Sequence, residues 1–336
     1  MKRLLAFIVV FMVIFFMEGS VLHAITDVKN NVNESVPGNM EVESAQDGAS
    51  ARMSKDGQTD KVKAVSGETQ KLQDGQEKYL LRYKWKKGET VSWMVTHRNY
   101  TQTTIRNTTE AVDARCVSEK SWYVVDVDEE GTATFTNTVP WAEMREKTGD
   151  KPLRVYDTRK EFMPPEGFED VPESIGVELA KLTVDCQGNM KSREDYHRTS
   201  IIQQANQAYI MVPLPKDPIP VGFSWTFSYP VYVPQNTGNL LRVQMMQKYT
   251  LQKVENGIAT IVYGTNIISP LSDPAIKAQL IDRIYEGKML FHIKEGRSMV
   301  LEQKVDQEVI GFRGEASRVK VKIMYTEQVM SPGTGG

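Results

Sequence analysis

Apolar and polar residues alternate on both sides of a glycine in two stretches of the chain, residues 122–138 and 249–265. Alternation with a period of two is typical of a strand that buries one face. Asn256-Gly257, between the alternating runs of the second stretch, is the strongest short signal for a β-hairpin. The pattern therefore predicts a strand, a turn and a returning strand in each stretch.

These stretches belong to a longer internal similarity, which becomes visible when Gly131 is placed over Gly257. It continues outward in two further pairs of segments: 87–93 with 220–225, and 182–190 with 290–298. Similarity over this length is expected when a whole supersecondary unit is repeated. We predict two β-rich halves of like plan, 78–212 and 213–331, joined by the proline-rich segment 213–220.

One helix is predicted between the hairpin and the later strands of each half. In the second half Asp273 is the expected N-cap, Pro274 the first helical residue and Gly287 the end of the helix. The apolar residues at helical spacing are Ile276, Leu280 and Ile284 there, and Phe168, Val171 and Ile175 in the first half, where Pro172 shortens the helix. The expected fold is α+β, mainly antiparallel β in two similar halves, with one helix per half packed on a curved sheet.

The two ends of the chain differ in composition from the β-rich halves. Two basic residues precede an apolar run, 4–17, that is shorter than the roughly 20 residues needed to span a bilayer, so residues 1–24 are predicted to be a secretory signal peptide. Residues 25–77 are polar with scattered single hydrophobics, which predicts a disordered tether, and 332–336 are expected to be a disordered tail. We expect export to the periplasm, the cell envelope or the medium, and no transmembrane helix in the mature chain.

The charge balance narrows the classes of partner. The 336-residue sequence carries 41 Lys and Arg against 43 Asp and Glu, a formal net charge of −2. This balance gives no support for nucleic acid or an anionic membrane as a partner. Cys116 and Cys186 are the only cysteines, and after export the two can form a disulfide or stay as buried free thiols.

An acidic string in the first hairpin raises the question of a calcium site. Asp126, Asp128 and Glu130 stand at the first, third and fifth places before Gly131, as in the opening of a calcium loop. The twelfth place, which needs a bidentate carboxylate, is Asn137, and the second hairpin keeps its turn without the acidic residues. We interpret the string as a hairpin turn and predict no metal site.

Few residues point to catalysis or ligand binding. His97 shares strand parity with Trp93 and is interpreted as a half-buried imidazole, which either lines a cleft or belongs to the edge of the core. Four tryptophans, Trp93, Trp122, Trp141 and Trp225, are interpreted as core or core-rim residues that can also line an apolar cavity. The chain has no H-E-x-x-H, C-x-x-C or G-x-S-x-G motif. Its one S-x-x-K string, Ser317 to Lys320, lies in a predicted strand that points the two side chains to opposite faces. We therefore predict no catalytic residue and no cofactor, and we favour a protein that is not an enzyme without deciding the question.

The strings LRYKWKKGETVSW, DVDEEGTATFTNTV, PVGFSW and SDPAIKAQL resemble those of a large family of exported bacterial β-rich domains whose function is unassigned. The resemblance covers residues 80–329 and implies a leader, a tether and a β-rich body, with no catalytic residues to carry over. The expected function is a non-catalytic envelope or secreted protein that binds a ligand or an envelope protein in a groove at the junction of the halves. The alternatives are a carrier of a lipid or other hydrophobic ligand, and an enzyme whose site is not recognised.

Overall fold

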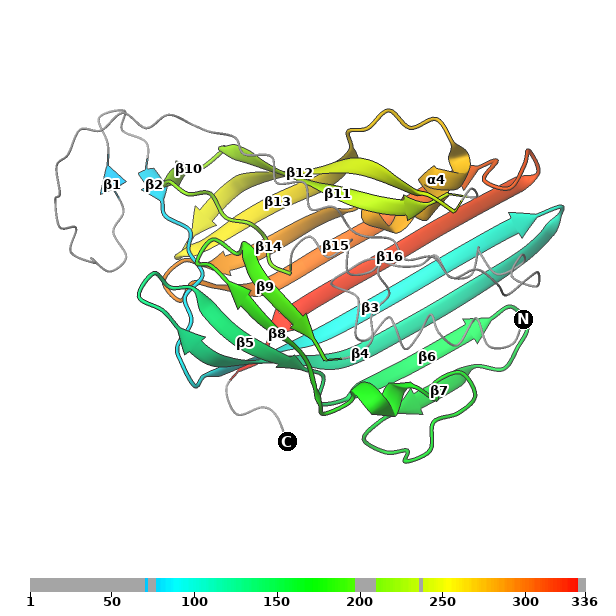
Figure 1. Ribbon diagram of the computed structural model, residues 1–336, viewed down its shortest axis with the longest axis horizontal. Coiled ribbons are helices and arrows are strands. Elements are labelled where there is room, and N and C mark those ends of the chain that lie inside the picture. Colours follow the sequence, from blue (N-terminus) through cyan, green and yellow to red (C-terminus); the bar gives the residue numbers. More distant parts are fainter. Residues whose placement is uncertain (1–69, 72–76, 197–209, 236–237, 332–336) are drawn as a thin grey trace, which may run out of the picture.

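The computed structural model describes residues 70–71, 77–196, 210–235 and 238–331 (Figure 1). The predicted signal peptide, most of the predicted tether and the tail 332–336 lie outside these residues. At the end of the predicted tether, β1 (Gln70–Lys71) pairs with β2 (Glu77–Tyr79), which also pairs with β10 (Ile219–Pro220). None of the described helices is long and apolar enough to cross a membrane.

Most of the described chain forms one curved sheet of 13 strands, with antiparallel pairing between neighbours. The strands are β3 (Thr90–Ile105), β4 (Thr108–Val127), β5 (Ala133–Thr138), β6 (Ala142–Thr148), β7 (Arg154–Asp157), β8 (Glu178–Val184), β9 (Met190–Asp195), β11 (Ser224–Pro234), β12 (Leu240–Glu255), β13 (Ile258–Ile267), β14 (Glu286–His292), β15 (Arg297–Ile310) and β16 (Ser317–Val329). Their order in the sheet is β11-β12-β13-β14-β15-β16-β3-β4-β5-β8-β9. Strand β4 is long enough to pair with β5 at one end and with β6 at the other, and β7 extends the sheet beyond β6.

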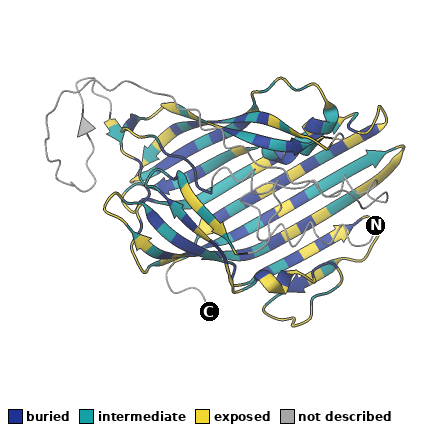
Figure 2. Ribbon diagram, in the orientation of Figure 1, coloured by how far each residue is buried: buried dark blue, intermediate teal, exposed yellow. Residues whose placement is uncertain are grey.

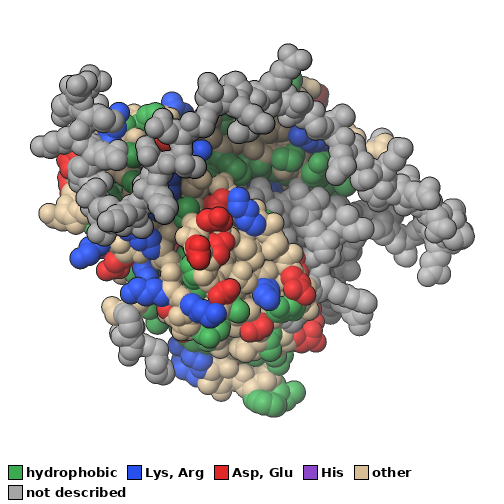
Figure 3. Space-filling model, turned by 60° about the vertical axis from the view of Figure 1, so that its left-hand side comes forward, with side chains coloured by type: hydrophobic (Ala, Val, Ile, Leu, Met, Phe, Trp, Pro, Cys, Tyr) green, Lys and Arg blue, Asp and Glu red, His purple; other side chains and the backbone are tan. Residues whose placement is uncertain are grey.

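Along the strands, buried residues alternate with exposed or half-buried residues (Figure 2). Since neighbouring residues of a strand point to opposite faces, the sheet buries one face, which we call the inner face, and leaves the outer face more exposed. Strand β16 shows the pattern: Val321, Ile323 and Tyr325 are buried, whereas the residues between them are exposed or half-buried. The face seen in Figure 3 carries Lys, Arg, Asp and Glu side chains of both signs, while hydrophobic side chains gather in a hollow near its top. This one-sided burial is what the period-two alternation predicts.

One row of directly paired residues crosses ten strands on the inner face. In order from β11 to β7 it consists of Trp225, Tyr249, Tyr263, Gly287, Gln303, Tyr325, His97, Cys116, Met144 and Tyr156. The interior of this sheet is therefore not purely aliphatic, because phenol, amide, imidazole and thiol groups lie side by side across it.

The predicted α+β class is wrong, because the described chain is nearly all antiparallel β. Among the described residues there is one α-helix, α4 (Pro274–Gln279), of six residues. Asp273 caps it as predicted, accepting a hydrogen bond from Ala275 N at 2.8 Å. The 3-10 turn η2 (Ile281–Arg283) follows directly.

In the first half the residues expected to form a helix contain only a 3-10 turn, η1 (Val171–Ser174). Pro172 and the preceding Pro164 and Pro165 leave too few consecutive residues to nucleate an α-helix. Phe168 and Val171 are buried against β6 and β7 instead, so the insertion adds strands to the sheet rather than a helix across it.

Gly287 does not end a helix; it lies inside β14. A Cβ atom at this position would lie 2.3 Å from Cζ of Tyr263 on the neighbouring strand. The glycine therefore makes room for the Tyr263 ring, which lies across it.

The two predicted hairpins are present, and they share irregular features. In both, the turn glycine has a positive φ, +81° at Gly131 and +77° at Gly257. Each hairpin also has a bulge at the same place, after Val124 in the first and after Leu251 in the second. Val124 O accepts from Gly88 N at 2.9 Å, and Leu251 O accepts from Gly222 N at 2.8 Å. These common features fit the alignment of the two halves, whose common origin stays a prediction.

Candidate functional site

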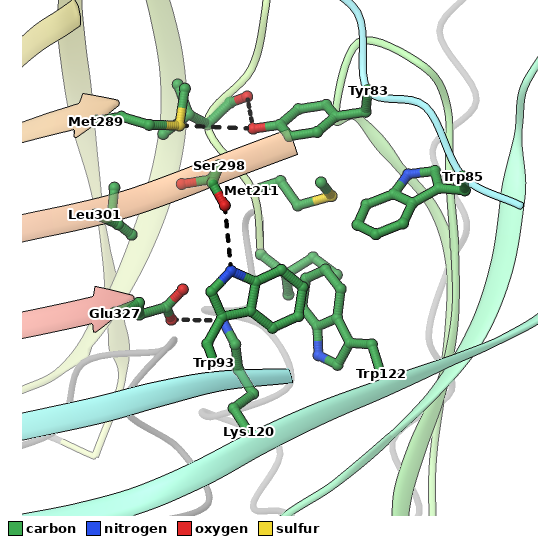
Figure 4. A pocket seen from close by; sticks show the side chains of 12 residues that line it. Tyr83, Trp85, Trp93, Lys120, Trp122, Met211, Met289, Ser298, Leu301 and Glu327 are labelled. Atoms are coloured by element: carbon green, nitrogen blue, oxygen red, sulfur yellow. Dashed lines mark hydrogen bonds and ion pairs between the residues drawn. The ribbon is translucent and has the colours of Figure 1, made fainter. Parts of the chain in front are cut away.

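A small cavity of about 30 Å³ lies on the inner face, where the two predicted halves meet (Figure 4). The second half contributes Met289, Ser298, Leu301 and Glu327 to its lining. The first half contributes Trp93, Lys120 and Trp122 from its strands, and Tyr83, Trp85, Ile210, Met211 and Val212 from segments outside the strands. Its volume matches one water molecule or a methyl-sized group. We call it the aromatic cavity.

A buried ion pair forms the polar wall of the aromatic cavity. Lys120 Nζ lies 2.5 Å from Oε1 of Glu327, and both side chains are almost entirely buried. They reach each other across β3, because Lys120 pairs with Trp93 on one side of that strand and Glu327 pairs with Val95 on the other. The same carboxylate oxygen accepts a hydrogen bond from the phenol of Tyr325.

Two indole rings surround the ammonium group of this pair. Lys120 Nζ lies 4.8 Å from the ring centroid of Trp93 and 4.9 Å from that of Trp122, both within cation–π range. Burial lowers the pKa of Lys120, while the adjacent charge of Glu327 acts in the opposite direction. Glu327 and the rings thus replace the water that would otherwise solvate the charge.

Two of the residues that line the aromatic cavity have hydrogen-bond donors that are not used. Trp93 Nε1 donates to Ser298 O at 3.3 Å. Trp85 Nε1 and Trp122 Nε1 are buried and have no acceptor among the residues that the structure describes. An unsatisfied buried donor costs about 1–3 kcal/mol, so an acceptor oxygen placed against either indole would recover part of that free energy.

Side chains of other elements hold the backbone of the segment 212–216, which begins at the cavity wall. Five consecutive carbonyl groups, of residues 212–216, accept hydrogen bonds from side chains of other elements: Tyr83, Trp225, Gln187 and, for the last two, Arg82. This binding fixes the proline-rich connection between the halves, and it places Met211 and Val212 against the aromatic rings.

Of the tryptophans and the histidine singled out in the sequence, Trp93 and Trp122 line the aromatic cavity. Trp225 stacks on Tyr249 with ring centroids 5.5 Å apart. Trp141 lies at the start of β6, where the guanidinium of Arg159 covers its ring at 3.8 Å. His97 lies farther along β3, opposite Tyr325 and Cys116.

His97 and Cys116 form a directly opposed pair, which is an arrangement that some catalytic sites use. An active pair of this kind requires a thiolate and an imidazolium. Burial instead raises the pKa of Cys116 to about 12 and lowers the pKa of His97 to about 3, so both groups are neutral near pH 7. The two side chains therefore pack in the interior as neutral groups.

Acid should destabilise the protein through His97. Its pKa is about 3 when folded and about 6.5 when unfolded, so below about pH 6.5 only the unfolded chain takes up the proton. From pH 7 to pH 5 we expect the free energy of unfolding to fall by about 2 kcal/mol on this account. Urea unfolding at both pH values should show the fall in the wild type and in His292→Gln, but not in His97→Gln. An unchanged pH dependence in His97→Gln would contradict the burial.

The acidic string forms the turn of the first hairpin. Asp128 Oδ1 accepts from the backbone N–H groups of Glu130 and Thr132, at 3.0 and 2.8 Å, and Asp126 pairs with Lys87 at 2.9 Å. Gly131 then reverses the backbone into β5. The hairpin is present as predicted, and the side chains of Asp126 and Asp128 bind the chain's own groups.

The two cysteines are free thiols in the structure. Cys116 is buried in β4 opposite Met144, whereas Cys186 lies in the turn after β8, next to Gly131. The segment that precedes β3 contacts this turn, because Tyr83 N donates to Cys186 O at 2.8 Å.

The sequence interpretation missed the ion pair, although a signal for it was present. Lys120 has the same strand parity as Trp122 and Val124, and Glu327 has that of Tyr325. A charged residue at an inward position of an alternating strand indicates a buried charge, which requires a partner. Tyr83 and Trp85 alternate with Lys84 and Lys86, and both aromatic residues are buried as that alternation predicts. The alternation does not show which cavity they line, because long-range contacts decide that.

No protein-family model matches the chain, and neither does any curated protein. Among solved structures, one of lipovitellin that concerns lipid–protein interactions aligns with 74% of this chain at 10% identity and a TM-score of 0.44. The chain spans about a quarter of that chain, 26% of its length. DynF of the dynemicin biosynthesis pathway of Micromonospora chersina aligns with 82% of this chain and 94% of its own, at 5% identity and a TM-score of 0.21. OccK7 of Pseudomonas aeruginosa aligns with 72% and 99%, at 8% identity and 0.20. Likeness at these scores carries no functional argument.

Proposed function

We propose that the chain is an exported, non-catalytic binding protein that holds an apolar ligand group in the aromatic cavity at the junction of its halves. The observation that carries the proposal is the cavity itself, which combines aromatic walls with two buried indole N–H donors that lack an acceptor. Ligand sites in proteins commonly combine an apolar lining with a few polar groups that fix orientation. The matching ligand has an apolar body and at least one acceptor oxygen.

The size of the cavity defines how such a ligand would enter. A volume of about 30 Å³ accommodates only the end of a ligand, so a larger body has to displace part of the wall. Among the wall residues that belong to no strand are Ile210, Met211 and Val212, which are consecutive in the chain. Their displacement would expose Met289 and Leu301 and leave the Lys120–Glu327 pair in place.

A carrier of a lipid or other hydrophobic ligand is the form of this proposal that the inner face favours. Apolar clusters surround the aromatic cavity on the β12–β14 side and continue under α4 toward β11. A chain-like ligand would find apolar surface there. The enzyme alternative has less support, because burial shifts the pKa values of His97 and Cys116 away from those of a reactive pair.

Native mass spectrometry of the full chain, purified from the envelope of its own host, tests the proposal. We expect a co-purifying small molecule that is retained in Trp141→Phe and reduced about tenfold in Trp122→Phe, which removes a hydrogen-bond donor from a residue that lines the cavity. The control removes an indole of the same size outside the cavity. A bare monomer, or equal occupancy in the two variants, would contradict the proposed site.

A further inference from the structure

The outer face carries a row of three arginines in direct cross-strand register. Arg98 of β3 pairs with Arg115 of β4, and Arg115 pairs with Arg145 of β6. All three are exposed. Like charges placed directly opposite each other destabilise a sheet, so this arrangement gives no advantage to folding.

Nearby acidic groups neutralise only one end of the row. Glu143 pairs with Arg145 at 2.9 Å. Asp113 lies two residues from Arg115 on the same face, and the Glu119 carboxylate accepts a hydrogen bond from the Trp141 indole. In the described part of the chain neither Arg98 nor Arg115 takes part in an ion pair, so two guanidinium groups remain available.

Exposed apolar side chains continue the row at both ends. Met324 of β16 pairs with Arg98 and is 49% exposed, and Val155 of β7 pairs with Arg145 and is 39% exposed. Beyond β7, Phe162 is 100% exposed and Met163 is 80% exposed. Adjacent bulky apolar side chains with this exposure indicate an interaction surface rather than scattered surface residues.

We propose that this row, Met324–Arg98–Arg115–Arg145–Val155, docks the protein on phosphoryl oxyanions of anionic phospholipid headgroups. Guanidinium groups bind phosphoryl oxygens through paired N–H donors. Neighbouring strands are about 4.8 Å apart, so the two available guanidinium groups, of Arg98 and Arg115, lie side by side and can meet two neighbouring phosphates. The apolar residues at the ends of the row match the boundary between headgroups and acyl chains.

Vesicle flotation with the full chain tests the proposal. We expect binding to vesicles of phosphatidylcholine and phosphatidylglycerol, no binding to phosphatidylcholine alone, and weakening as the salt concentration rises. Arg98→Gln/Arg115→Gln should bind about 25-fold more weakly, about fivefold per charge. Arg242→Gln/Lys248→Gln, which removes two exposed charges from β12, should bind like the wild type. The melting temperature of Arg98→Gln/Arg115→Gln should equal or exceed that of the wild type, because a repulsion is removed.

Three outcomes would overturn the inference. The first is absence of wild-type binding to the anionic vesicles, and the second is equal loss of binding in the two double variants. The third is release of the protein by inorganic phosphate at constant ionic strength, which would indicate a discrete phosphate site instead of a lipid surface. None of these outcomes bears on the aromatic cavity, which lies on the other face of the sheet.

Discussion

Glu327→Gln is expected to lower the free energy of unfolding by about 3 kcal/mol, because it leaves the buried ammonium of Lys120 without a counter-charge. Lys120→Met should have an effect of similar size, because Glu327 then keeps only the phenol of Tyr325. The double variant Lys120→Met/Glu327→Gln should lose less than the sum of the two, because neither charge remains buried. Urea unfolding of the four proteins at pH 7 measures all three values.

The Glu327→Gln variant should also respond to pH in a defined direction. Its folded state disfavours the protonated Lys120 more than the unfolded chain does, so the unfolded chain binds more protons. The stability of the variant should therefore recover as the pH rises toward the ordinary pKa of lysine. Single substitutions that each cost under about 1 kcal/mol would show that the pair is solvated in solution.

Gly296→Ala is expected to destabilise the protein by about 3 kcal/mol, because it combines backbone strain with a collision. Gly296 has φ +64°, and a Cβ atom there would lie 2.6 Å from Arg82 O and 2.5 Å from Cγ of Lys84. Residues 82–84 would have to move away from the β14–β15 turn, and the hydrogen bond from Lys84 N to Gly296 O, 2.9 Å long, would be lost.

Gly257→Ala provides the matched control for this substitution. Gly257 also has a positive φ, +77°, but no other group lies within 4 Å of the position of its Cβ. Its substitution should cost only the strain of the left-handed backbone, about 1–2 kcal/mol. Thermal or urea unfolding of the two variants separates the two contributions. Equal losses would mean that the segment before β3 does not pack on the turn.

The local elements of the fold could be predicted from the sequence. The hairpins around Gly131 and Gly257 follow from alternation and turn chemistry, and Asp273 caps α4 as its position indicates. The helix content could not be predicted in the same way. Gly287 was interpreted as a helix end, yet its absent side chain makes room for a ring from the neighbouring strand, and nothing in the local sequence distinguishes these two reasons for a glycine.

Only part of the candidate site could be predicted from the sequence. Alternation places Lys120 and Glu327 inside the sheet, but it does not show that they meet across β3. The net charge of −2 could not predict the row Arg98–Arg115–Arg145, because a sum over the chain contains no information on where the charges lie. Strand register, which depends on long-range pairing, decides both features.

The order of the strands has a consequence for the timing of folding. The centre of the sheet is the pairing of β16 with β3, which joins Trp93 to Val329 and Ile105 to Ser317. This pairing cannot form until the ribosome has synthesised nearly the whole chain, and closing so long a loop is slow. An incomplete chain therefore leaves the inner faces of both halves uncovered, so the nascent protein should depend on holding chaperones until its last strand emerges.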